Sequence, residues 1–509
     1  MSDDTAIALT LISHTNAGKT TLARTLLGRD IGEVRDAPHV TIEATPLLLI
    51  QSPRGDTLTL WDTPGFGDSV RLANRLRQQG NPIGWFLAQV WDRYRDRTSW
   101  LTQRAVRNVH EEADVVLYLV NAAEEPCDAG YLDPELEVLE WIGKPVLVLL
   151  NQTGRPREHV EEAADVARWR EALAGAGHVR DVLTLDAFAR CWVQELTLFA
   201  AVERVLPAAK TPAFDRLVDA WRARRTAQFD EAMAALAGPI ARAAVERAVL
   251  PVVPLSARLS ASLGLMRVSG KGARARASRE MSARLDADLQ ASMARLLAIH
   301  ELEGGAAGEV RQRLAGDLRT EAPLDEGKAA VMGGAVSGAL TGLGADLLAG
   351  GLTFGGGMLA GAALGALGGA GVARGVNVVR GRTETSMRWE DVFLDGLVTA
   401  ALLRYLAIAH YGRGRGEWEE GEYPSFWRQR VVRGVVAHEP RLAAIWALRA
   451  DPAYLARIER DLQEALSDMA RALLAGLYPG ALGAGSPSAA LTPSSTAGPA
   501  TPPSGRPPA

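Results

Sequence analysis

The nine residues from Ser13 to Thr21, Ser-His-Thr-Asn-Ala-Gly-Lys-Thr-Thr, have the types and spacing needed to hold a phosphate group. They lie between the apolar run Ile7 to Ile12 and the helix-forming run Leu22 to Leu27. A strand that turns into a helix through such a loop presents backbone N–H groups and the helix N-terminus to an anion. We expect Lys19 to add a positive charge and Thr20 to offer its hydroxyl to Mg²⁺. The residues expected to contact the nucleotide in this loop are Asn16, Ala17, Gly18, Lys19, Thr20 and Thr21.

A second motif, Asp62-Thr63-Pro64-Gly65, follows this loop at a spacing that suits nucleotide chemistry. Two apolar segments, 45–50 and 57–61, read as strands joined by the turn at 52–56, and the second delivers Asp62 at its end. An aspartate beside a phosphate loop can hold Mg²⁺ through water, and Gly65 lets its backbone N–H approach the γ-phosphate. Asp-x-x-Gly is common by chance, but after this phosphate loop it indicates an NTPase.

Continuous apolar runs at 115–120 and 145–150 predict buried parallel strands, and a third strand is expected at 182–185. The second run ends at Asn151-Gln152-Thr153-Gly154. Asp186-Ala187 follows the third, and a helix should then reach about Val205. The predicted fold class is therefore an α/β P-loop NTPase domain with a mostly parallel sheet and helices on both faces, over residues 1–207.

This pattern resembles the Era-like branch of the translation-factor-related GTPases over about the first two fifths of the chain. Asn16 stands where that branch has the asparagine of its phosphate loop, and Asp62 to Gly65 matches the third motif in full. Asp36-Ala37-Pro38-His39-Val40-Thr41 resembles the first switch. The resemblance implies a GTP/GDP site in which Thr20, Thr41 and Asp62 hold Mg²⁺, with Lys19, Thr41 and Gly65 acting on the γ-phosphate.

The fourth motif departs from the family pattern Asn-Lys-x-Asp. Asn151 is kept and Gln152 replaces the lysine, while Gly154 stands in the place of the aspartate that accepts two hydrogen bonds from guanine. Guanine and adenine specificity both stay open at this point, with GTP favoured by the rest of the pattern. Asp186-Ala187 replaces the Ser-Ala of the fifth motif.

Phe66 occupies the place where Ras-like enzymes carry the glutamine that orients the attacking water. A phenylalanine cannot orient water, so intrinsic hydrolysis is expected to be slow unless a homodimer, another partner or a cation supplies the missing element. Asn16 suggests K⁺ as that cation, because some Era-like GTPases hold K⁺ with this asparagine.

Composition narrows the function classes. The 509 residues are 47% hydrophobic and 23% charged with a net charge of −4, which fits a folded protein of two or three domains and gives no reason to expect nucleic-acid binding. Two cysteines, Cys127 and Cys191, predict neither disulfides nor a metal-ligand spacing. No basic, apolar leader opens the sequence, so a cytoplasmic protein is expected, with any contact to the inner face of the membrane made by an internal segment.

An insertion at about 68–108 carries Trp85, Phe86, Trp91, Tyr94 and Trp100. Two interpretations are open: an interaction surface that moves with the second switch, or extra helices that pack their aromatic side chains into the domain.

Residues 208–479 predict a mainly helical domain. The stretch 213–318 reads as successive amphipathic helices broken near Pro239 and at 251–254, and helices are also expected at 389–411, as an amphipathic one, and at 441–477. Residues 480–509 are composed of Gly, Ala, Ser, Thr and Pro and should be disordered.

The Gly/Ala-rich segment 329–373 differs from the rest of this half. Glycines recur every four residues in two sets, which predicts a helical hairpin with smooth ridges. Either the hairpin enters a bilayer from the cytoplasmic side, with Lys328 and Arg374 at its outer ends, or it packs in a soluble core or against a partner.

The whole architecture resembles a bacterial family in which an Era-like domain precedes a helical domain of unknown function. Our leading hypothesis is a GTP-binding, slowly hydrolysing switch that controls a helical and membrane-associated output domain. The alternative is a membrane-associated scaffold whose nucleotide domain binds but barely hydrolyses. Nucleotide-driven membrane remodelling ranks third.

Overall fold

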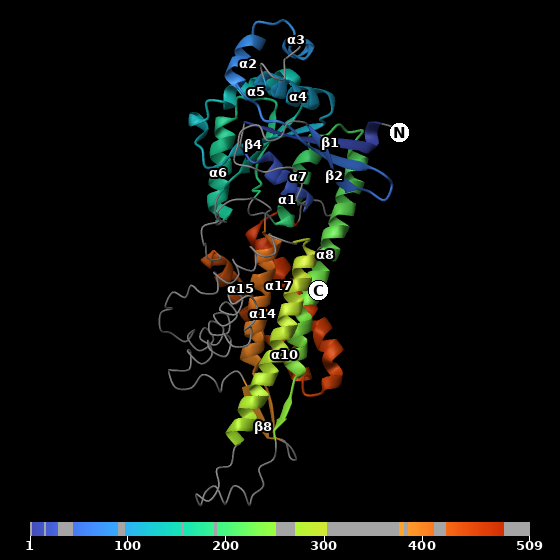
Figure 1. The fold of residues 1–509 in the computed structure, drawn as a ribbon, viewed down its shortest axis with the longest axis vertical. Helices are drawn as coiled ribbons and strands as arrows, with labels where there is room; N and C mark the ends of the chain where they lie inside the picture. Colours follow the sequence, from blue (N-terminus) through green and yellow to red (C-terminus); the bar gives the residue numbers. More distant parts are fainter. Residues whose placement is uncertain are drawn as a thin grey trace, which may run out of the picture.

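The structure is a computed structural model of the full chain. It describes residues 3–14, 17–28, 44–89, 97–153, 157, 159–187, 191–250, 270–302, 376–380, 385–411 and 424–482. An α/β part lies at one end of an elongated molecule and a helical part at the other (Figure 1).

The N-terminal part is built on a six-stranded sheet in the order β2-β3-β1-β4-β5-β6. All neighbours are parallel except β2, which pairs antiparallel with β3. The carboxyl ends of β1, β3 and β5, which carry the predicted motifs, therefore meet at one edge of the sheet. The strands are β1 (Ala6–Ser13), β2 (Thr45–Gln51), β3 (Thr57–Asp62), β4 (Val115–Asn121), β5 (Val146–Asn151) and β6 (Val179–Thr184).

Helices cover both faces of this sheet. One apolar cluster packs β1, β3 and β4 against α1, α7 and α8, and another packs the opposite sheet face against α2 to α6. The helices of this part are α1 (Lys19–Leu27), α2 (Ser69–Leu76), α3 (Pro82–Ala88), α4 (Arg97–Glu111), α5 (Leu132–Ile142), α6 (His159–Ala172) and α7 (Trp192–Glu203), with short turns η1 (Asp3–Thr5) and η2 (Pro126–Asp128).

The strands predicted from the apolar runs are confirmed, although β6 begins at Val179 rather than 182. In the insertion, α2, α3 and the start of α4 pack on the domain, and Phe86 is 1% exposed within the second cluster. For Phe86 the packing interpretation is thus the correct one. Trp91 and Tyr94 lie outside the described residues.

The C-terminal part is mainly helical, as predicted, with one feature that periodicity did not suggest. A small antiparallel sheet in the order β7-β9-β8 lies at the far end of the helices (Figure 1). The elements of the C-terminal part are α8 (Thr211–Val245), β7 (Ala248–Leu250), α10 (Gly270–Ile299), β8 (Val376–Arg380), β9 (Thr385–Trp389), α14 (Asp391–Ala409), α15 (Ser425–Ala437), α16 (Glu439–Leu448), η3 (Pro452–Tyr454) and α17 (Leu455–Leu477).

The predicted break at Pro239 is wrong, because α8 runs through it for 35 residues. Proline removes one helical hydrogen bond, but the surrounding turn is buried: Ala237, Pro239, Ile240 and Ala241 all lie in the core of this half. Packing against α10 and α17 outweighs the lost bond. The second break, at 251–254, lies outside the described residues.

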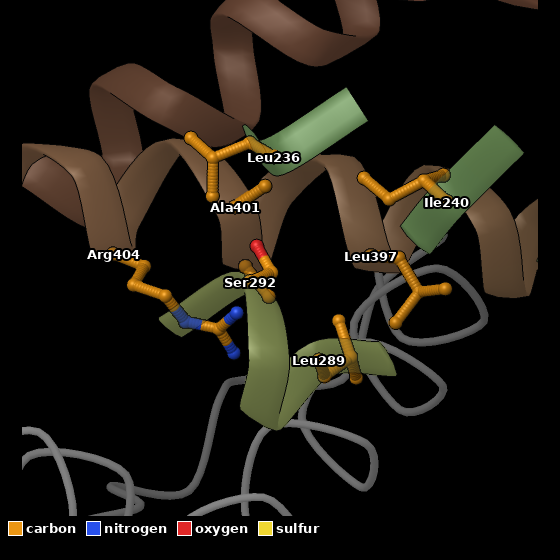
Figure 2. A pocket seen from close by; sticks show the side chains of 8 residues that line it. Leu236, Ile240, Leu289, Ser292, Leu397, Ala401 and Arg404 are labelled. Carbon is orange, nitrogen blue, oxygen red and sulfur yellow. The ribbon is translucent and has the colours of Figure 1, made fainter. Parts of the chain in front are cut away.

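Helix α14 is also not the amphipathic helix we expected. It is apolar on nearly every side and lies in the centre of the helical core, where Leu397, Ala401 and Arg404 face α8 and α10 around a small cavity (Figure 2). Among the described residues it is the helix that is long and apolar enough to cross a membrane, but 78% of its apolar window is buried within the protein. Burial all round explains why its sequence lacks a polar face.

Other predictions concern residues that the structure does not describe. The Gly/Ala-rich segment 329–373 and residues 483–509 lie outside the described part of the chain, so neither the hairpin nor the disorder of the tail is tested.

A partly buried ion pair joins the sheet to α8. The Arg216 guanidinium donates from Nε and Nη2 to the two carboxylate oxygens of Asp56 at 2.8 and 2.7 Å. Ser52 donates to the same carboxylate at 2.5 Å. Asp56 is 2% exposed, and the hydrogen bonds from Arg216 lower its pKa from 3.8 to about 2. The hairpin between β2 and β3 is therefore fixed to α8.

Asp56→Asn should lower the melting temperature by roughly 2–4 °C at pH 7, because the amide cannot pair with both guanidinium nitrogens. Since the pKa of Asp56 is depressed on folding, its contribution is complete above its ordinary pKa of 3.8 and is lost as the pH falls towards 2. Thermal unfolding of both proteins across this range should show the difference shrinking below pH 3.8. A difference that stayed constant down to pH 2 would contradict the assignment.

Candidate nucleotide site

The loop between β1 and α1 has the geometry of a phosphate cradle. Gly18 caps α1 with φ of 88°, and its carbonyl accepts the first helical hydrogen bond from Leu22 N at 2.9 Å. A Cβ added to Gly18 would come within 2.6 Å of Asn151 Nδ2. Both the left-handed backbone and this close approach require glycine here. The N-terminus of α1 lies at the edge of the sheet where β1 ends, which is where a phosphate group would accept from its backbone N–H groups.

Lys19 is buried beneath this loop, with 7% of its surface exposed. Its Nζ donates to Ser13 Oγ at 2.8 Å. Burial lowers the pKa of Lys19, while the charges of Asp62 and Glu135 raise it. The serine that replaces the first glycine thus orients the ammonium group, which is a role that the sequence alone did not suggest.

Thr20 and Asp62 meet at the end of β3, as the two motifs predicted. Thr20 Oγ1 donates to Asp62 Oδ2 at 2.7 Å, and the buried Asp62 Oδ1 has no hydrogen-bond partner among the residues that the structure describes. Burial raises the pKa of Asp62, against the opposing effects of Thr20, Lys19 and Arg24. Two hard oxygen groups with an unsatisfied buried carboxylate oxygen suit Mg²⁺, which takes few protein ligands and completes its shell with phosphate and water. The residues present therefore fit the ion.

Asn151 ties the phosphate loop to the loop after β6. Its Nδ2 donates to Ala17 O at 2.8 Å, and its Oδ1 accepts from Ala187 N at 2.8 Å. The hydroxyl of Thr25 on α1 donates to Ala187 O at 2.8 Å. Asn151 is fully buried. This connection places the fourth and fifth motifs beside the phosphate loop.

The fourth and fifth motifs, in the loops after β5 and β6, are the place where the base of a nucleotide is expected to bind, and we call this place the base site. Gln152 has φ of 58°, in the left-handed region. Thr153 donates to Asp186 Oδ2 from both its backbone N and its hydroxyl, each at 2.7 Å. Asp186 is 2% exposed. The structure therefore brings Asp186 next to the eroded fourth motif, which the spacing of the two segments did not predict.

Beyond Asp62 the third motif turns back towards β1. Thr63 Oγ1 donates to Leu11 O at 2.6 Å, and Phe66 N donates to Ser13 O at 2.9 Å. Gly65 is buried between these two anchors. Phe66 is 0% exposed and lies in the apolar cluster under α2 and α3.

Phe66→Gln is expected to leave the rate of GTP hydrolysis unchanged, because the side chain at this position points into the core. It should also lower stability, since an amide buried without partners costs about 1–3 kcal/mol and burial of the ring is lost. Single-turnover hydrolysis and urea unfolding measure the two effects. A tenfold faster hydrolysis would show that residue 66 reaches the nucleotide.

A buried carboxylate that sequence reasoning missed lies on the far side of the loop. Glu135 on α5 is 0% exposed and bonds His14 Nδ1 at 2.7 Å and Tyr118 OH at 2.8 Å. The His14 ring stacks on Tyr131 with centroids 4.4 Å apart. Burial raises the pKa of Glu135, opposed by His14, Tyr118 and Lys19. No sequence signal identifies Glu135, because its partners lie on different elements.

The remaining predicted site residues divide into two groups. Ala17 and Thr21 lie at the loop and in the first turn of α1, both buried. Asn16 and Thr41 lie outside the described residues, so the K⁺ site and the first switch are not tested. Among the described residues there is no cluster of three or more His, Cys, Asp or Glu side chains that could hold a metal ion alone. A Mg²⁺ shared with phosphate oxygens needs no such cluster.

The strand order, the phosphate cradle and the Thr20–Asp62 pair define a P-loop GTPase domain. The family model described as 50S ribosome-binding GTPase matches residues 9–152. The N-terminal part accordingly resembles a GTPase domain, of the kind that binds GTP and generally uses Mg²⁺.

The rest of the chain gives the particular family. The model described as Domain of unknown function (DUF3482) matches residues 170–465, which is more than half of the chain, so the protein belongs to that family. The match begins on α6 and ends on α17. Comparison with curated proteins gives no match.

Solved structures of Era are similar to part of this chain. A variant of Aquifex aeolicus Era bound to GDP·AlF4⁻ aligns with 17% identity and a TM-score of 0.29. Era in complex with MgGDPNP and a 16S ribosomal RNA fragment aligns with 17% identity and a TM-score of 0.30. Each alignment covers 40% of this chain and 57% of the Era chain, so little more than half of the Era length is represented.

Proposed function

We propose that this GTPase is a slow nucleotide switch whose state controls the helical C-terminal part. The observation that carries the proposal is α8, a single continuous helix that packs on β2 and β3 and then runs the length of the helical part (Figure 1). Through the Asp56–Arg216 pair, α8 is attached to the hairpin whose second strand ends at Asp62. A shift of Asp62 towards Mg²⁺ and γ-phosphate would therefore act on α8.

A second connection leads from the base site. Helix α7 begins at Trp192, soon after Ala187, and the Trp192 indole donates to Tyr405 OH on α14 at 3.2 Å. Glu195 on α7 pairs with Arg225 on α8 at 3.3 Å, and the two side chains are 1% and 16% exposed. Binding of a base at this site would thus change the contacts that α7 makes with both α8 and α14.

In the site itself, Lys19, Gly18 and Thr20 bind the phosphates, and Thr41 and Asp62 sense the γ-phosphate together with Gly65. Mg²⁺ held by Thr20, Thr41 and Asp62 would neutralise charge on the phosphates. Because Phe66 is buried, hydrolysis should be slow, on the order of the unassisted Ras rate of 10⁻⁴ s⁻¹. Asn16 is the candidate ligand for an activating K⁺, and a homodimer is an alternative activator.

The buried Phe66 also favours a second function: a scaffold that binds GTP without using its hydrolysis. Single-turnover hydrolysis of GTP by the full chain, in matched K⁺ and Na⁺ buffers, separates the two. A rate that is slow but above the spontaneous one supports the switch, and a faster rate in K⁺ supports the role of Asn16. No hydrolysis in either buffer supports the scaffold.

The output is proposed to be engagement of the inner face of the cytoplasmic membrane, or of a membrane protein, through residues 329–373. Support for this comes from the composition of that segment, whose glycine ridges and flanking basic residues suit a hairpin in lipid. Flotation of the full chain and of a 329–373 deletion with lipid vesicles tests it. Equal flotation of the two proteins would refute the role of the segment.

A further inference from the structure

The base site contains a buried carboxylate in an unexpected place. The fourth motif ends in Gly154 instead of aspartate, but Asp186 approaches the same loop from the end of β6 and accepts both hydrogen bonds of Thr153 at 2.7 Å. Asp186 is 2% exposed. A carboxylate removed from one loop is therefore replaced by a carboxylate from the adjacent loop.

The surrounding contacts fix where this carboxylate lies relative to the phosphates. Asn151 bonds Ala17 of the phosphate loop on one side and Ala187 N, the residue after Asp186, on the other. Thr25 on α1 holds the carbonyl of the same alanine at 2.8 Å. Through Ala187, Asp186 is thus connected to the phosphate loop at Ala17 and to α1 at Thr25. Its position should change little when a nucleotide binds.

The chemistry of the carboxylate suits guanine. Guanine presents two adjacent donors, the N1–H and the 2-amino group, whereas adenine presents a ring-nitrogen acceptor at N1 and lacks the 2-amino group. An ionised carboxylate accepts hydrogen bonds and donates none, so its chemistry matches these two donors. Facing adenine, it would oppose one acceptor with another.

We propose that Asp186 is the residue that selects guanine in this protein, and that Thr153 is a positioning residue that orients its carboxylate. Ser-Ala at this place in Era-like enzymes becomes Asp-Ala here, and Asp becomes Gly at residue 154. The two changes together transfer the acceptor from the loop after β5 to the loop after β6. This inference rests on the proposed function, since it assumes that the site binds a nucleoside triphosphate.

The test is the base preference of the full chain with Asp186→Asn. Fluorescent GTP is displaced by unlabelled GTP, ATP and xanthosine triphosphate, whose xanthine base carries a carbonyl acceptor where guanine carries its amino group. Wild type should prefer GTP. Asp186→Asn should bind GTP roughly 10–100-fold more weakly and bind xanthosine triphosphate more tightly than wild type does, because the new amide donates to that carbonyl.

Asp181→Asn is the matched control, because Asp181 lies on β6 and pairs with Arg170 and Arg204 at the surface. Its base preference should equal that of wild type. If Asp186→Asn fails to fold, Asp186→Ser keeps an acceptor for Thr153 N and removes the carboxylate. This variant should lose the preference for GTP over ATP without gaining xanthosine triphosphate.

The outcomes separate the two proposals. A folded Asp186 variant that keeps the wild-type preference for GTP overturns the assignment while the switch survives. Equal binding of GTP and ATP by wild type would likewise overturn the assignment of Asp186 and leave the proposed switch intact. Wild type that binds no nucleoside triphosphate overturns the proposed function and this inference with it.

Discussion

Lys19→Ala is expected to remove measurable GTP and GDP binding and to reduce hydrolysis by at least 10²–10³-fold, on the order of the loss when a preorganised charge at a reacting group is deleted. Lys19 is buried under the phosphate loop and oriented by Ser13, so no other described side chain occupies its place. Titration of fluorescent GDP and GTP into both proteins measures the effect.

The fold should survive this change, because keeping a charged lysine buried costs free energy that alanine does not. The circular dichroism spectrum and urea midpoint of the variant should stay close to those of wild type. Lys144→Ala, in the turn before β5, is the matched control and should bind normally. Retention of wild-type affinity by a folded Lys19→Ala would mean that the loop is not the phosphate site.

The second large effect is expected for Asn151→Ala, which should lower both stability and nucleotide affinity. The change leaves Ala17 O and Ala187 N, two buried backbone groups, without the bonds from the amide. Each buried group left unsatisfied costs about 1–3 kcal/mol. Urea unfolding and GDP titration of the same sample report the two losses.

Asn121→Ala provides the comparison for that experiment. Asn121 ends β4 in direct register with Asn151 on β5. Within the described part of the chain, its side chain accepts one local bond, from Ala123 N at 3.0 Å, and makes a weak contact with Glu124. Its replacement should cost clearly less stability and leave affinity intact. Equal losses in the two variants would show that Asn151 has no special role in joining the loops.

Local sequence patterns were sufficient for the site residues that follow strands directly. The sequence predicts that Lys19, Thr20 and Asp62 lie near one another, because strand ends in a parallel sheet meet at one edge and the apolar runs of β1 and β3 identify those strands. The structure brings Thr20 and Asp62 into contact at 2.7 Å. The parallel sheet could also be predicted from the sequence, since strands that are buried on both faces are continuous apolar runs.

Contacts between elements that are distant in the sequence could not be predicted from local patterns. Glu135 bonds partners on other elements, and its neighbours in sequence show no motif. Asp186 stands in the place of the fifth motif, but the sequence did not predict its contact with Thr153. The same holds for the helical half: Pro239 predicted a break that packing overrides, and α14 lost its expected polar face because it is surrounded by other helices. Periodicity reports which face is buried only when one face is exposed.

Hydrogen–deuterium exchange of the full chain, loaded with Mg²⁺ and either GDP or a non-hydrolysable GTP analogue, tests the switch most directly. We predict that the two states differ in exchange at the phosphate loop and also in α7, the C-terminal half of α8, and α14 around Tyr405, since Asp56–Arg216 and Trp192–Tyr405 join the two parts. Differences confined to residues 1–207 would contradict the account, because the helical part would then not respond to the nucleotide.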